Sequence, residues 1–301
     1  MAYTGELISL GTALCWTFTV VGFEYAGKRV GSLPVNIIRL LFGFIFLGIT
    51  LTIISGSFLP IDASSETWIW LILSGVVGLV IGDLFLFQAF VDVGGRISLL
   101  IYSIVPVISA ALGLLFFNEI LSFVELIGMV VTLTAIALVI LWRGKKKNIT
   151  HPHSTRGIIF AFIGAISQSV GLLLSKQGMG DYGAFASTQI RVMTAIVGFA
   201  IYITIRKQWK NVFLAFKDKT ALKFILLGSI FGPFLGVSSS LLALKYIDMG
   251  ISTTIAQLNV ILIIPFSVIL FKEKVNYKEI IAAVVAIMGA ALLFIDFSNI
   301  F

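Results

Sequence analysis

Long apolar runs separated by short polar connections dominate the chain, and they constrain its fold more than any other feature. A membrane-spanning helix needs about 20 consecutive, mostly apolar residues. Ten such runs can be placed, at residues 6–24, 34–54, 68–91, 97–117, 122–142, 157–175, 184–205, 222–244, 251–271 and 277–296. Charged residues make up only 12% of the sequence, about half of their usual share in soluble domains. The sequence therefore predicts an all-α integral membrane protein with ten transmembrane helices.

The two halves of the chain repeat each other on either side of a basic connection. Shifting the second half back by 152 residues places Arg191 on Arg39, and a shift of 154 residues places Glu273 on Glu119. Two extra residues in one loop reconcile these shifts. We therefore expect a first five-helix repeat over residues 1–143, a linker over 144–156 and a second five-helix repeat over 157–301.

Most basic residues lie in connections that share one face of the predicted protein. Of the 21 Lys and Arg residues, 17 lie in these connections, Lys176 and Lys245 lie on the other face, and Arg39 and Arg191 lie within spans. Basic connections stay in the cytoplasm, so both termini are expected outside. Since each repeat has an odd number of spans, the second is inverted relative to the first. Inverted repeats are characteristic of secondary transporters, whose substrate site lies near the middle of the membrane.

Three charged residues lie in the predicted spans away from the span ends, where charge is costly and usually functional. Arg39 and Asp83 lie about 8 Å and about 12 Å from the basic face at the rise of a helix, so they could form an ion pair. Arg39 could instead extend to the lipid headgroups. Arg191 lies about 10 Å from the other face. It could bind an anionic or zwitterionic substrate, or pair internally with a backbone carbonyl.

Neutral polar residues at depth form a second candidate set, consisting of Trp16, Ser167, Gln168, Ser238, Ser239, Ser240, Gln257 and Asn259. Trp16 and Gln168 are repeat partners in the first and sixth spans. A buried amide must be hydrogen-bonded or must face a wet cavity. These residues could therefore join helices or line a central substrate cavity, and their convergence in repeat-related spans is what a cavity requires.

Several residues near the span ends also repeat. Glu119 and Glu273 precede the fifth and tenth spans, and they could act in gating or coupling or could hold a turn in place. The stretches Ser122–Glu125 and Asn276–Glu279 predict capping boxes at the starts of those spans. Pro106 and Pro265 predict kinks within the fourth and ninth spans. The glycines of the third and eighth spans predict close helix packing.

The residues needed for catalysis are poorly represented. Both histidines, His151 and His153, lie in the linker, away from any span. The single Cys15 provides no thiolate metal cluster, and no glycine-rich phosphate-binding loop is present. The net charge of +7 is explained by the topology and does not indicate nucleic acid. We therefore expect no enzyme activity, no metal and no cofactor, with a proton or ion gradient as the remaining source of energy.

The duplication is accompanied by Trp16 in the first span, Arg39 at the start of the second, and two related stretches at residues 106–119 and 264–273. In these features the chain resembles the drug/metabolite transporter superfamily, specifically its EamA-type carriers. The resemblance covers nearly the whole chain. It implies ten spans from a duplicated five-span unit, and export of amino acids and related metabolites by alternating access.

We therefore expect a secondary carrier in the plasma or inner membrane that moves small polar metabolites outward, with a small-molecule substrate and the lipid bilayer as its partners. Export of hydrophobic cations or drugs is the first alternative, and it predicts no effect of Arg191→Ala. A non-transporting membrane partner or lipid-handling subunit is the second, and it predicts no flux in liposomes. The sequence leaves the oligomeric state open.

Overall fold

The computed structural model describes residues 3–142, 155–271 and 275–294, and every regular element over these residues is a helix. The first repeat contains α1 (Thr4–Val30), α2 (Ser32–Ser55), α3 (Ser65–Ser74), the π-helix η1 (Gly75–Ile81), α4 (Gly82–Asp92), α5 (Gly94–Tyr102), α6 (Val105–Phe117) and α7 (Phe123–Trp142). The second contains α8 (Thr155–Met179), α9 (Ala184–Ile205), α10 (Trp209–Ala215), α11 (Lys219–Ser229), the π-helix η2 (Ile230–Gly236), α12 (Val237–Ala243), α13 (Met249–Ala256), α14 (Asn259–Phe271) and α15 (Tyr277–Leu292).

The predicted spans and the observed helices agree closely. Nine helical segments among the described residues are long and apolar enough to cross a membrane. The tenth predicted span corresponds to α15, which has 16 residues. The predicted all-α fold with two repeats is therefore confirmed. Most of the linker, with both histidines, lies outside the described residues, as does Glu273.

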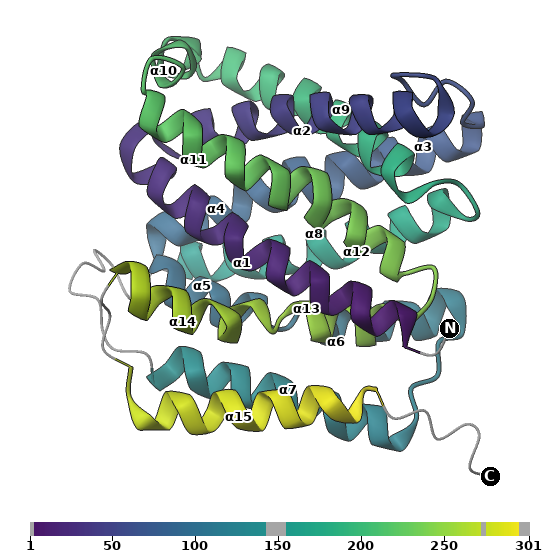
Figure 1. Ribbon diagram of the computed structural model, residues 1–301, viewed down its shortest axis with the longest axis vertical. Coiled ribbons are helices and arrows are strands. Elements are labelled where there is room, and N and C mark those ends of the chain that lie inside the picture. The colour runs from purple at the N-terminus through teal and green to yellow at the C-terminus, as the bar shows by residue number, and fades with distance from the viewer. Residues whose placement is uncertain (1–2, 143–154, 272–274, 295–301) are drawn as a thin grey trace.

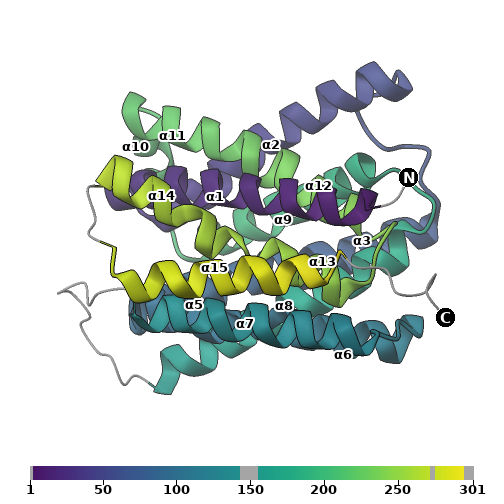
Figure 2. The same cartoon turned by 60° about the horizontal axis from the view of Figure 1, so that its bottom comes forward.

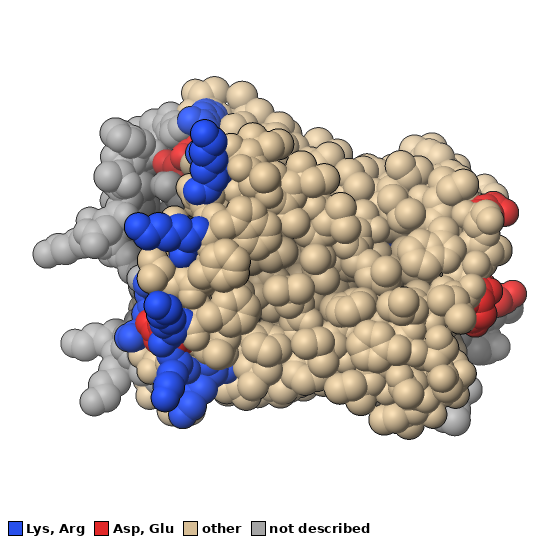
Figure 3. Space-filling view, turned by 90° about the horizontal axis from the view of Figure 1, so that it is seen from above, with Lys and Arg blue, Asp and Glu red and all other residues tan. Residues whose placement is uncertain are grey.

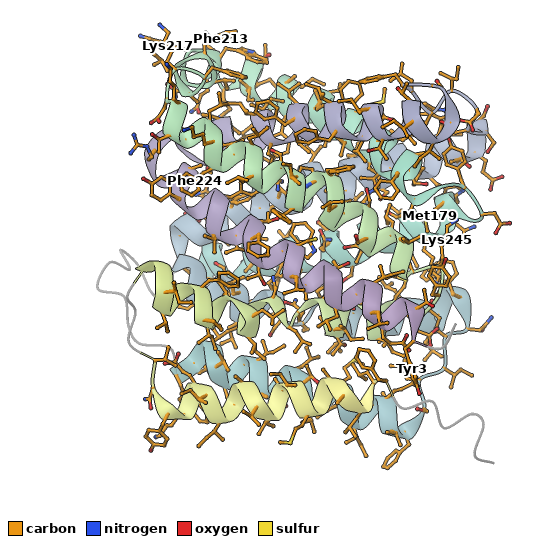
Figure 4. All side chains as sticks on the ribbon, in the orientation of Figure 1. Tyr3, Met179, Phe213, Lys217, Phe224 and Lys245 are labelled. Carbon is orange, nitrogen blue, oxygen red and sulfur yellow. The ribbon has the colours of Figure 1, made fainter. Side chains whose placement is uncertain are left out.

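The two ends of the molecule differ in charge. We call one the basic end, and its described Lys and Arg residues are Arg29, Arg156, Arg206, Lys207, Lys210, Lys217, Lys219, Lys223 and Lys278. Figure 3 shows the basic side chains of the visible face gathered at one end, with acidic side chains among them, and acidic side chains alone at the other end. Figure 4 places Lys217 at the first end, and Tyr3, Met179 and Lys245 at the opposite end. Because α1 starts at the opposite end and α8 starts at the basic end, the two repeats run in opposite directions.

Helix packing joins the two repeats throughout the body of the protein. The first helix of each repeat packs on the third span of the other, so α1 contacts α11 and α12, and α8 contacts α3 and α4. The second spans, α2 and α9, also pack together. Helices α7 and α15 form a separate pair at one side (Figures 1 and 2). The first four spans of each repeat therefore build the central body of the protein.

Four spans depart from regular α-helix at repeat-related positions. The third and eighth spans contain η1 and η2, and Pro233 within η2 has no N–H to donate. The fourth span is interrupted at 103–104 and the ninth at 257–258. Pro106 therefore lies in the first turn of α6 and not inside one continuous kinked helix, whereas Pro265 does lie within α14. Interrupted helices and π-helices are common at functional sites of membrane carriers.

Candidate functional site

Arg39 and Asp83 form an ion pair inside the central body. Asp83 lies in the first turn of α4, directly after η1, and Arg39 projects from α2. The Arg39 guanidinium carbon also lies 5.3 Å from the centre of the Phe23 ring and 5.9 Å from that of Phe87. Arg39 is only 7% exposed. Of the two arrangements that the sequence allowed, the structure has the ion pair, because the side chain points into the protein and not towards the headgroups.

Arg191 is buried more completely than Arg39 and has no comparable partner. It is 1% exposed, and its Nε has no hydrogen-bond partner. Among the described residues, its side chain forms no ion pair. Asp83 lies within electrostatic range of Arg191, although the Asp83 carboxylate is already paired with Arg39. The structure thus places the three charged residues in one neighbourhood, with two positive charges and one negative charge.

Trp16 and Gln168 occupy corresponding places in the two repeats. Trp16 lies beside Gly236, since a Cβ on that glycine would be 3.6 Å from the indole Cε2. The backbone nitrogen of Gln168 lies 3.9 Å from the position that a Cβ on Gly82 would take. Both residues are half-buried. They flank the ends of the two π-helices, and their role in substrate binding stays a prediction.

Gln257 and Asn259 lie where the ninth span is interrupted. The Gln257 side-chain amide donates to the backbone carbonyl of Tyr102 at 3.4 Å, which connects the interruptions of the fourth and ninth spans. The Asn259 backbone carbonyl accepts from the Thr17 hydroxyl at 3.5 Å, while its side-chain Oδ1 is buried without a partner. Gln257 therefore joins helices, and Asn259 retains an unused acceptor.

Tyr102 was not predicted as a site residue. It ends α5, and it lies within electrostatic range of Asp83. The corresponding residue in the second repeat is Ala256, so comparison of the repeats does not identify Tyr102. A tyrosine inside the predicted fourth span is the only sequence signal that could have indicated it.

Glu119 connects three spans at the opposite end. Its carboxylate forms an ion pair with Lys176 at the end of α8. The same carboxylate accepts a hydrogen bond from the backbone N–H of Met249, the first residue of α13, at 2.8 Å. Glu119 is 9% exposed. It therefore does more than hold the turn before α7, although a role in gating stays a prediction.

Asp248 adjoins this cluster as the residue before α13. Burial raises the pKa of Asp248, the neighbouring Glu119 and Glu125 raise it further, and Lys176 opposes them. Asp248 therefore binds a proton more readily than an exposed aspartate does.

The fourth and ninth spans pack together at the opposite end but not at the basic end. Helix α6 packs along α13, and a Cβ on Gly250 would lie 2.6 Å from that of Ala110. The repeat-related pair, α5 and α14, shows no comparable packing over the described residues. Over the described residues, the fourth and ninth spans are therefore in closer contact at the opposite end than at the basic end.

No group of three or more His, Cys, Asp or Glu side chains that could hold a metal ion occurs within the described ranges. The site instead offers charge, hydrogen-bond donors and aromatic faces. Such a set can bind and orient a small polar molecule without covalent chemistry.

Comparison with known proteins agrees with this interpretation of the chain. The profile of the EamA-like transporter family matches residues 3–141 and 155–295. An uncharacterized transporter from Archaeoglobus fulgidus is 23% identical over 291 residues, which cover 95% of this chain and 96% of that protein. One solved crystal structure has the same fold, with a TM-score of 0.71 at 16% identity, covering 97% of this chain and 96% of the other.

Proposed function

The chain belongs to the EamA-like transporter family, and we propose that this multi-pass membrane protein is a secondary active transporter that exports small polar metabolites such as amino acids. The observation that carries the proposal is the buried charged group of Arg39, Asp83 and Arg191 at the contact between the two repeats. Buried charges within spans mark substrate or ion pathways. The interrupted fourth and ninth spans support the same location.

We propose that transport follows alternating access, with the two repeats rocking around this central group. The packing of α6 on α13, together with the Glu119–Lys176 ion pair, closes the opposite end. If the basic end faces the cytoplasm, as the positive-inside rule predicts, this arrangement is the inward-facing one. Export would then require the Glu119 contacts to break.

Metabolite profiling tests the proposed function, because it surveys many small molecules at once and requires no choice of substrate. Medium and cytosol are compared for cells that lack, carry or over-produce the protein, with Asp83→Asn at equal abundance as the inactive control. We expect one class of small polar compound to accumulate in the medium with the wild type only. Unchanged profiles in all strains would contradict export of a common metabolite.

Asp83 is the candidate coupling residue, because it is the acid of the central group. If it carries a coupling proton, Asp83→Asn abolishes gradient-driven flux in liposomes while exchange of substrate across the membrane continues. Loss of both activities would count against coupling and would assign Asp83 to substrate binding or to the position of Arg39.

A further inference from the structure

The buried arginines of the two repeats, Arg39 and Arg191, differ in their partners. Arg39 has an acid partner, Asp83, which follows the π-helix η1. The corresponding residue of the second repeat, at the shift of 154 that aligns Gly82 with Gly236, is Val237. Val237 follows η2 directly and is 6% exposed. Arg191 therefore lacks the carboxylate that its repeat partner has.

No other acid forms an ion pair with Arg191 among the side chains that the structure describes. The Arg191 side chain makes no hydrogen bond to a described residue, and its Nε is buried without a partner. Arg39 and Asp83 neutralise each other, so the central group retains one uncompensated positive charge. A buried charge without a counter-ion is strongly unfavourable. Such a charge indicates that an anion binds here during the working cycle.

Two glycines let the backbone of η1 approach Arg191 closely. A Cβ on Gly78 would lie 3.2 Å from Nη2 of Arg191, and one on Gly75 would lie 2.9 Å from its backbone oxygen. Both glycines belong to η1, which packs against α9. The guanidinium therefore faces backbone, and larger side chains at these positions would crowd it.

We propose that Arg191 binds a carboxylate of the transported molecule, in the role that Asp83 has towards Arg39. A planar guanidinium matches a carboxylate with two parallel hydrogen bonds. One carboxylate brings the single negative charge that Arg191 lacks. A phosphate monoester, with a charge of about −2 at pH 7, would leave an excess of negative charge. A hydrophobic cation would add to the positive charge. This proposal rests on the proposed transport function and specifies its substrate class.

Stability without ligand separates a binding role from a structural one. Arg191→Met removes an uncompensated charge, so the melting temperature of the purified protein stays at or above the wild-type value. Arg39→Met leaves Asp83 unpaired and therefore lowers the melting temperature. Thermal unfolding in detergent measures both. An equal fall for the two variants would show that Arg191 is held by structural partners and would overturn the proposal.

Ligand-induced stabilisation tests the substrate class. The probes are the L-amino acids and simple monocarboxylates, each compared with its own amide. We expect at least one acid to raise the melting temperature while its amide does not, and Arg191→Met to abolish this shift. Val237→Asp places a carboxylate where the second repeat lacks one, and it competes with the ligand. Val237→Asn introduces a side chain of the same size as aspartate without its charge. It should therefore reduce the ligand-induced rise in melting temperature less than Val237→Asp does.

Equal stabilisation by acids and amides, or by no acid at all, would overturn the carboxylate site. Neither result bears on the transport proposal, because the metabolite profiling uses Asp83→Asn as its control and does not depend on Arg191. A profiled substrate without a carboxylate would leave the transporter in place and remove this inference alone.

Discussion

The carboxylate of Glu119 accepts a hydrogen bond from the backbone N–H of Met249 at 2.8 Å, so an acid of the first repeat caps a helix of the second. The same carboxylate is paired with Lys176 of α8. Three spans are thus joined through one side chain at the end where the fourth and ninth spans pack. Opening this end requires these contacts to separate.

Glu119→Gln weakens this closure, because a neutral amide can still accept from Met249 but cannot neutralise Lys176. We expect the variant to populate the open arrangement more often. If the closed arrangement is destabilised by about 1.4 kcal/mol relative to the open one, the open population rises about tenfold. Ser252→Cys reports opening, since Ser252 is buried against Ser9 with their hydroxyl oxygens 3.1 Å apart. In a Cys15→Ser background, thiol labelling should accelerate by about tenfold.

The control for this experiment is Glu66→Gln, which alters an exposed acid in the first turn of α3. It should leave the labelling rate of Ser252→Cys at the level of the background protein. Equal rates for the Glu119 and Glu66 variants would show that the Glu119 contacts do not limit opening.

Asp248 makes stability depend on pH. Burial, followed by Glu119, raises its pKa in the folded protein, so the native state binds this proton more tightly than the unfolded state does. This contribution to stability is present at low pH and is lost as pH rises through the raised pKa. Asp248→Asn should therefore have the higher melting temperature at pH 7. The difference should vanish towards pH of about 4, the usual carboxyl pKa; a constant difference would contradict the assignment.

The Arg39–Asp83 pair should behave as a coupled unit. Arg39→Met leaves a buried carboxylate unpaired, and breaking a buried pair costs about 3–5 kcal/mol. The double variant Arg39→Met/Asp83→Asn removes both charges and should be more stable than Arg39→Met alone. Chemical unfolding of the four proteins of this cycle measures the coupling free energy. Additive effects would show that the two side chains do not interact in solution.

Gly171 allows α8 to approach η1 closely. A Cβ on Gly171 would lie 2.6 Å from the Cα of Gly78, so Gly171→Ala requires the backbones to separate. Overpacking of this kind costs about 1–3 kcal/mol. Gly11→Ala is the matched control, because nothing lies within 4 Å of its added Cβ. It should be neutral, or stabilising by up to about 1 kcal/mol, and thermal unfolding distinguishes the two variants.

Local chemistry made part of the structure predictable. The Ser122 and Glu125 contacts form as predicted, with the Ser122 N–H donating to the Glu125 carboxylate at 2.6 Å. Asn276 and Glu279 form the second capping box. The Arg39–Asp83 pair was one of two arrangements that the sequence allowed, because both residues enter their spans from the same face at similar depth.

Other features depend on neighbours that are distant in sequence. Lys176 is 57 residues from Glu119, and no periodicity links them. The interruption at 257–258 has no glycine or proline at the break, whereas the one at 103–104 lies just before Pro106, which cannot donate to the carbonyl of Tyr102. Of the two π-helices, only η2 contains a proline. These irregular segments lie where helices from different parts of the chain pack against each other.

The sequence by itself determined the ten apolar runs, the duplication, the separation of charge between the two ends and the residues that carry charge inside the spans. Each follows from the cost of placing polar groups in hydrocarbon, which acts on every span separately. Only the tertiary structure decided that Arg39 has an acid partner, that Arg191 has none over the described part of the chain, and that Glu119 joins three spans at one end. These relationships depend on the positions of side chains from different spans, and helix packing sets those positions.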